Sequence, residues 1–211
     1  MSSVASSAID RSGVDRSRGL YMLARVISDL LSPAALAVPG LMLGVWASRV
    51  PGTFNYALLY FAVAIPIPFL YCVWLLKTGR ITDIHLPNRK ERIGPFAVAS
   101  ASAAGGVALL LLVGAPKEFV APLIAALAQT LLLFAITLLW QISIHTSVSA
   151  GLATFAILGI GGAAVLFSLL VPVVMWARLY LKRHTFAQTV AGAALGCGAF
   201  TALFLLHGIA W

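Results

Sequence analysis

Long apolar blocks recur along this chain, and they restrict the folds that it can adopt. The five clearest blocks are Leu31–Ser48, Tyr56–Leu76, Phe96–Gly114, Phe119–Trp140 and Thr185–Leu206. Each is close to the length of about 17–25 residues that a helix needs to cross a bilayer core of ~30 Å. Hydrophobic residues make up 61% of the chain, against about 45–50% in soluble domains. The sequence therefore predicts an all-α, polytopic transmembrane helix bundle.

The N-terminal residues differ from these blocks. Residues 1–19 are rich in Ser and Arg, and they lack the apolar core and cleavage site of a signal peptide. This composition predicts a disordered tail that is retained. The segment Leu20–Leu31 carries Arg25 and Asp29 among apolar residues, which is typical of a helix at the membrane interface. We therefore expect one membrane-embedded domain over residues 20–211.

The apolar stretch between His145 and Arg178 is longer than one ordinary span. It could form one long tilted helix or two short helices, which gives six or seven crossings in total. The run Gly159-Ile160-Gly161-Gly162 divides the stretch near its middle. Glycine is unfavourable inside a helix and common at tight turns, although it also occurs in closely packed membrane helices. The glycine run favours a hairpin.

The distribution of basic residues also favours the hairpin. With a hairpin, the polar segments 77–95, 141–147 and 178–184 all lie on one membrane face. Of the 14 Lys and Arg residues in the chain, all but Arg49 and Lys117 then belong to that face. Because Lys and Arg are retained on the cytoplasmic side, the sequence predicts a cell (inner) membrane protein with a cytoplasmic N-terminus and a cytoplasmic polar face.

Two histidine segments on this face contain the chemistry of interest. In Arg178-x5-His184-x3-Gln188, the histidine and the glutamine would share one helix face. The amide oxygen of Gln188 could then accept a hydrogen bond from one ring nitrogen and leave the other nitrogen as a nucleophile or base. Ser143 and His145 would begin another helix, where free backbone N–H groups favour anions. Arg178 offers the planar donors that suit phosphate oxygens.

The segment before the third apolar block adds a third group of polar residues. Arg89 and Arg92 are three residues apart and could hold the same anion. His85 lies in the same loop. Taken alone, this loop could simply contact anionic lipid headgroups, and a lone histidine near a helix end is usually an interfacial residue. The joint order and spacing of the three segments favour an anion site.

The three segments together resemble the type 2 phosphatidic acid phosphatase family, whose fold core is related to vanadium haloperoxidases. The family motifs are Lys-x6-Arg-Pro, Pro-Ser-Gly-His and Ser-Arg-x5-His-x3-Asp. The segment from Arg178 to Gln188 matches the third motif at full spacing, with Ala177 for Ser and Gln188 for Asp. The resemblance covers roughly residues 77–200. In the other two motifs, Ser143 and His145 match the second, while Arg92 and His85 occupy the Arg and Lys positions of the first.

This resemblance implies a membrane phosphatase acting on a lipid phosphate or a polyprenyl (di)phosphate. His184 would form a phosphohistidine, His145 would protonate the leaving group and Gln188 would orient His184. The other matched residues, namely Arg178, Ser143, Arg92 and His85, would bind phosphate together with the nearby Arg89. Family members usually need no metal and no cofactor, so the expected partners are the lipid substrate and membrane lipids.

Gln188 also supports a second interpretation. A neutral amide stabilises an imidazolium less than the family's Asp, so the chain could be a degenerate member that binds or moves a phospholipid without hydrolysis. Two other classes of membrane enzyme, prenyltransferases and CDP-alcohol phosphotransferases, fit the sequence poorly. These enzymes need clustered aspartates for metal ions, and Asp83 is the only aspartate in a relevant loop. The basic residues lie between apolar blocks, and the chain has no nucleic-acid-binding motif, so we do not expect it to bind nucleic acid. The sequence leaves the lipid tail, the mono- or diphosphate head and the oligomeric state open.

Overall fold

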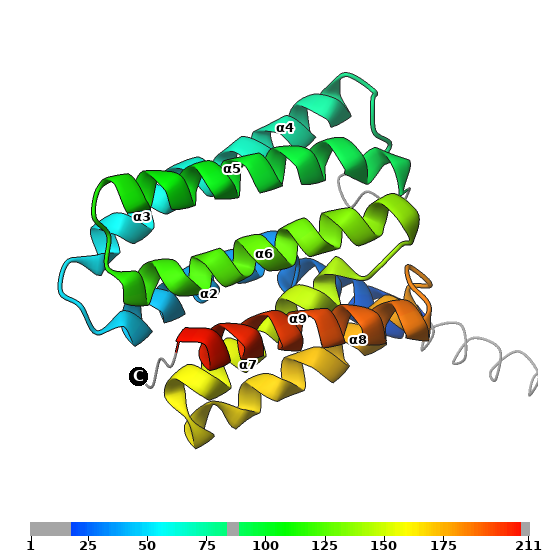
Figure 1. Ribbon diagram of the computed structural model, residues 1–211. Coiled ribbons are helices and arrows are strands. Elements are labelled where there is room, and N and C mark those ends of the chain that lie inside the picture. Colours follow the sequence, from blue (N-terminus) through cyan, green and yellow to red (C-terminus); the bar gives the residue numbers. More distant parts are fainter. Residues whose placement is uncertain (1–17, 84–88, 208–211) are drawn as a thin grey trace, which may run out of the picture.

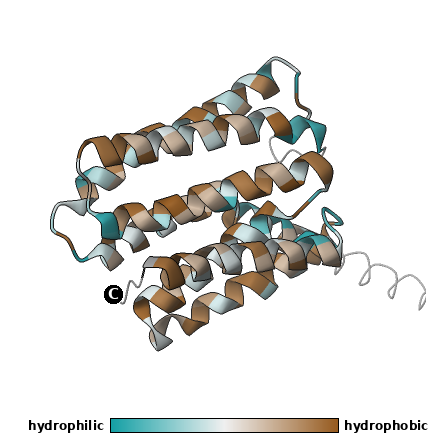
Figure 2. Ribbon diagram, in the orientation of Figure 1, coloured by the Kyte–Doolittle hydropathy of each residue, from teal (hydrophilic) through white to brown (hydrophobic). Residues whose placement is uncertain are grey.

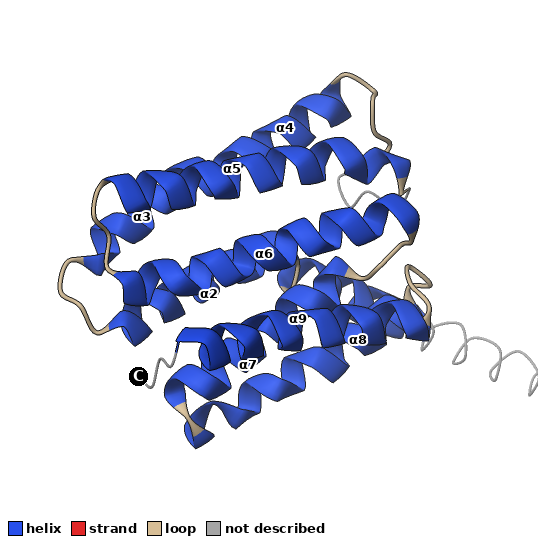
Figure 3. Ribbon diagram, in the orientation of Figure 1, coloured by secondary structure: helices blue, strands red, loops and turns tan. Residues whose placement is uncertain are grey.

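The computed structural model describes residues 18–83 and 89–207, and all regular structure in these ranges is helical (Figure 3). The predicted disordered tail therefore lies almost wholly outside the described residues. The first helix, Arg18–Leu30, begins two residues before the predicted interfacial segment. It is followed by α2 (Pro33–Ser48), to which it is bent by 46°. Ser32 caps α2 by accepting a hydrogen bond from the Ala35 N–H, so the break between the two helices is stabilised locally.

The second predicted span is broken once. It consists of α3 (Thr53–Ala64) and α4 (Pro66–Lys77). Pro66 has no N–H to donate into the preceding turn, and it is well suited to the first position of a new helix. The two helices still form one apolar segment of 25 residues, which is long enough to cross a membrane, with a proline break near its middle.

Three further predicted spans correspond to helices whose ends agree within three residues. They are α5 (Ile93–Leu112), α6 (Lys117–Leu139) and α9 (Phe186–His207). The 3₁₀ turn η1 (Lys90–Arg92) leads directly into α5. The polar segments therefore lie where these helices begin or end.

The predicted turn in the Gly159–Gly162 run is also confirmed. The helix α7 (Ile144–Ile160) ends there, and the chain returns through η2 (Gly162–Leu169) and α8 (Leu170–Tyr180). Gly161, between α7 and η2, has φ 87°, in the left-handed region that glycine adopts without strain. The return places the C-terminal end of α8 at the same end of the bundle as the start of α7 (Figure 1).

Helices α7 and α9 run side by side and approach closely (Figure 1). A Cβ atom on Gly192 would collide with the carbonyl oxygen of Ser143, and one on Gly196 with that of Ser147. Glycine at these two positions lets the backbones meet, as in small-xxx-small pairs of membrane helices. The first turn of α7 is therefore held against the second and third turns of α9.

The long apolar helices indicate a membrane-embedded protein. Within the described ranges, five helical segments are long and apolar enough to cross a membrane, if adjoining elements such as α3–α4 and η2–α8 count as one segment. They are Thr53–Lys77, Lys90–Leu112, Lys117–Leu139, Gly162–Tyr180 and Phe186–Leu206. The number is six if the bent pair of Arg18–Leu30 and α2 counts as one span. The apolar α7 is shorter, at 17 residues. Hydrophilic residues gather near the helix ends (Figure 2). They are most frequent where α4, α6 and α8 end and where α5, α7 and α9 begin, which we call the polar end of the bundle.

Candidate functional site

His184 lies at the polar end, and Gln188 fixes its orientation. The Gln188 backbone N–H donates to Thr185 Oγ1 (3.3 Å), and the Thr185 N–H donates to Gln188 Oε1 (3.0 Å). This reciprocal pair is a capping box at the start of α9. The same Oε1 lies 3.2 Å from His184 Nδ1, so the predicted contact between the two side chains is confirmed.

The capping box also determines which ring nitrogen of His184 holds the proton. Because Oε1 accepts from the Thr185 N–H, it is the oxygen of the amide that faces His184. An amide oxygen only accepts hydrogen bonds, so Nδ1 must donate its proton to it. In the neutral ring, Nε2 then has a free lone pair.

The surroundings of His184 keep its ring neutral. The side chain is buried, and burial is the main reason that its pKa falls from 6.5 to about 4. The positive charges of Arg178, Arg92 and Arg183 act in the same direction, whereas the hydrogen bond to Gln188 opposes the shift. At neutral pH, His184 is therefore an uncharged base beside three guanidinium groups.

Two of these arginines come from different helices and are deeply buried. Arg178 lies in the last turn of α8 and Arg92 at the end of η1, and each is 3% exposed. Their charges act on each other and on His184. Closely spaced like charges repel, so the cluster favours an anion that can lie among them.

The first turn of α7 is joined to this cluster through its backbone. The Ser143 N–H donates to the Gln188 carbonyl (3.2 Å), which links the second predicted segment to the third. Ser143 is fully buried and caps α7 by accepting from the Thr146 N–H (3.5 Å). His145 follows in the first turn and is also buried. The structure therefore brings the two histidine segments together.

The first predicted segment is divided. Arg92 is within electrostatic range of His184, but Arg89 donates from Nη1 to the Leu138 carbonyl (2.9 Å) near the end of α6. The structure thus uses Arg89 to connect η1 with α6. His85 lies outside the described residues.

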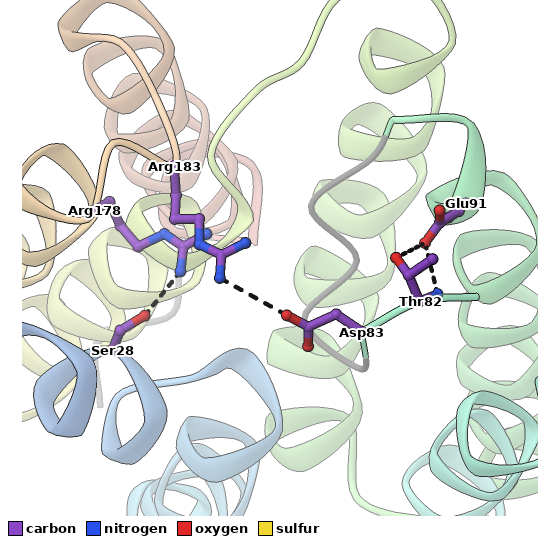
Figure 4. Close-up of polar contacts among 6 residues, drawn as sticks. All are labelled: Ser28, Thr82, Asp83, Glu91, Arg178 and Arg183. Carbon is purple, nitrogen blue, oxygen red and sulfur yellow. Dashed lines mark hydrogen bonds and ion pairs between the residues drawn. The ribbon is translucent and has the colours of Figure 1, made fainter. Parts of the chain in front are cut away.

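Sequence reasoning missed three residues that belong to the cluster. Arg183 adds a third positive charge, and it pairs with Asp83 at 3.7 Å (Figure 4). Ser28 accepts a hydrogen bond from Arg178 Nη1 (2.8 Å), and the negative charge of Asp29 attracts the same guanidinium. Two features of the sequence could have pointed to these residues. Ser28 and Asp29 form a polar pair within an apolar helix, and Arg183 directly precedes His184.

Fold and site together define a helical membrane protein with a buried cluster of arginine and histidine at one end of its bundle. Comparison with protein-family models, curated proteins and solved structures gives no match. Within residues 18–83 and 89–207, no group of three or more His, Cys, Asp or Glu side chains could hold a metal ion. The donors in the cluster are guanidinium and imidazole groups, which suit an anion with several oxygens, such as phosphate.

Proposed function

We propose that the protein is a membrane phosphatase that removes phosphate from a lipid phosphate or a polyprenyl (di)phosphate. The observation that carries the proposal is the neutral His184, held through Nδ1 by Gln188 and placed among Arg178, Arg92 and Arg183. A lipid substrate fits this position, because its anionic head can reach the polar end while its tail stays in the bilayer.

The proposed reaction has two displacements. His184 Nε2 attacks phosphorus, the bond from phosphorus to the leaving oxygen breaks, and His145 gives that oxygen a proton. Water then attacks the phosphohistidine and returns a proton to His145 as the N–P bond breaks. Arg178 and Arg92 stabilise the charge on the equatorial oxygens in both steps. Ser143, Arg89 and His85 are the further candidates for phosphate binding, and the chemistry needs no metal.

We further propose that the chain crosses the cell (inner) membrane seven times, with α7 as a short span and the polar end in the cytoplasm. The support is the turn at Gly161, after which the C-terminal end of α8 lies at the same end of the bundle as the start of α7. Arg178 lies in that last turn of α8 and His145 in that first turn of α7. The packing of α7 against α8 and α9 around this end is consistent with the phosphatidic acid phosphatase-like core implied by the motifs.

The second candidate function is a degenerate relative that binds or moves a phospholipid without hydrolysis. The observation that favours it is the double role of Gln188, which caps α9 as well as contacting His184. A residue retained for capping would hold His184 in place without supplying the negative charge that a phosphatase of this type uses.

Phosphate release separates the two functions. Purified protein in detergent is given phosphatidate or a polyprenyl diphosphate, with and without a chelator. We expect release that persists in chelator and falls by at least about 10³-fold in His184→Ala, because the nucleophile is lost. His207→Ala makes the same change at the other end of α9 and should keep wild-type activity. Equal, slow release by wild type and His184→Ala would reject the phosphatase in favour of binding.

A further inference from the structure

The N-terminal helix Arg18–Leu30 reaches the candidate site through Ser28. The Ser28 hydroxyl accepts a hydrogen bond of 2.8 Å from Arg178 Nη1, across 150 positions of sequence. Ser28 is 2% exposed, and Ala24, one turn earlier on the same face, is fully buried. Figure 4 shows Ser28 on this helix below the guanidinium of Arg178. The helix is therefore packed into the bundle along the face that carries Ser28.

The contact uses the side of the guanidinium that phosphate does not need. In arginine, Nη1 lies on the same side as Cδ, while the N–H bonds of Nε and Nη2 point in parallel from the opposite edge. Nε of Arg178 is buried and makes no hydrogen bond within the described ranges. Ser28 thus holds one corner of the guanidinium and leaves the two-donor edge available for two oxygens of one phosphate.

The group that holds this guanidinium by a hydrogen bond, the Ser28 hydroxyl, is neutral. The charges of Arg92 and Arg183 repel Arg178, and Asp29 on the N-terminal helix offsets part of that repulsion. A hydroxyl can fix the direction of the guanidinium without neutralising the positive charge that an anionic ligand needs. Ser28 and Asp29 are neighbours on one helix, so the orienting contact and the attractive charge come from the same element.

We infer that Ser28 is a positioning residue, which holds Arg178 so that its Nε–Nη2 edge faces the phosphate group. The inference rests on the proposed function, because it assumes a phosphate ligand at the cluster. It assigns the N-terminal helix to the site itself and not only to the membrane surface.

Substitutions at Ser28 test this role in the full chain in detergent. Affinity for inorganic phosphate and the kcat/KM for phosphatidate are measured for each variant. Ser28→Ala should lower both by about tenfold, since a hydrogen bond to a charged group is lost. Ser28→Thr keeps the hydroxyl and should stay within about twofold of wild type. Ser168→Ala removes a hydroxyl that bonds only to its own helix and should change neither value.

A double-mutant cycle with Arg178→Lys distinguishes positioning from a general loss of structure. Lysine has no two-donor edge for Ser28 to orient, so Ser28→Ala should have almost no further effect in the Arg178→Lys background. Equal losses in both backgrounds would overturn the inference, as would wild-type values in Ser28→Ala. If the wild type binds phosphate but hydrolyses no substrate, the phosphate affinities of the variants still test the inference. A wild type that does neither rejects both the inference and the proposed function.

Discussion

Gln188 joins the stability of a helix to the chemistry of a histidine through one oxygen atom. Its Oε1 accepts from the Thr185 N–H and from His184 Nδ1. Any change that moves this oxygen affects the start of α9 and the direction of the His184 ring together. Glutamate is the one substitution that keeps the length of the side chain and the capping-box pattern while adding a charge.

We therefore predict that Gln188→Glu raises the pKa of His184 above its present value of about 4. A carboxylate beside the ring stabilises the protonated form, and protonated His184 cannot attack phosphorus. Activity of the wild type should thus be lost as the pH falls toward about 4, and activity of Gln188→Glu should be lost at higher pH. The measurement is the acid limb of kcat/KM for the two proteins on one substrate.

Ionisation of the substrate affects both proteins equally. The prediction is therefore tested by the difference in pH between the acid limb of the wild type and that of Gln188→Glu. An acid limb that stays in place, or that moves to lower pH in Gln188→Glu, would show that residue 188 does not control the protonation of His184. Unchanged thermal unfolding of the variant would confirm that the capping box is preserved.

At the scale of single residues, the sequence predicts contacts between residues that are close along the chain. It does not predict contacts between residues that are distant in the sequence and meet only in the folded protein. The spacing of His184 and Gln188 predicted their hydrogen bond on a shared helix face, and the bond is present. Because His184 precedes α9, the capping box brings the two side chains together and not a shared helix face. No local pattern could connect Ser28 with Arg178, because their helices meet only in the packed bundle. The same holds for Arg89, whose partner carbonyl at Leu138 belongs to the end of another helix.

At the scale of elements, the most consequential contact is the close approach of α7 and α9. It depends on Gly192 and Gly196, and it sets the distance between the two histidine segments. The spacing Gly192-x3-Gly196 is typical of closely packed membrane helices, and the structure places both glycines against α7. The sequence predicts one span over Tyr56–Leu76, and the structure breaks it at Pro66, where a proline ring cannot continue the hydrogen bonding of α3.

We predict that Gly196→Ala destabilises the protein by about 1–3 kcal/mol, the usual range for overpacking. The added methyl group would meet the Ser147 carbonyl and the Gly151 N–H of α7 and push the helices apart. Thermal unfolding in detergent measures the effect, and phosphate release should fall with it. Gly198→Ala is the matched control, since its Cβ meets nothing within 4 Å.

The control should be neutral or up to about 1 kcal/mol more stable, because alanine is the better helix former. If Gly196→Ala and Gly198→Ala unfold at the same temperature, the close contact between α7 and α9 does not support the fold in the way described.

At the scale of the whole molecule, basic residues are distributed unevenly between the two ends of the bundle. Lys77 and Arg178 close α4 and α8 at the polar end, whereas Arg49 follows α2 and Lys117 begins α6 at the other end (Figures 1 and 2). The helices alone are compatible with either orientation in a membrane. Orientation depends on how the charges are retained during insertion, so it has to be inferred from their distribution.

If the polar end is cytoplasmic, a cysteine at Thr78 should resist an impermeant thiol reagent in intact cells, and one at Lys117 should react. Both positions are exposed, so accessibility depends on the side of the membrane and not on burial. The substitutions are made with the native Cys72 and Cys197 replaced by alanine, which removes background labelling. Permeabilised cells should label both variants and show that each cysteine is reactive. Labelling of Thr78→Cys with protection of Lys117→Cys in intact cells would reverse the orientation, and the proposed phosphate site would then face outward.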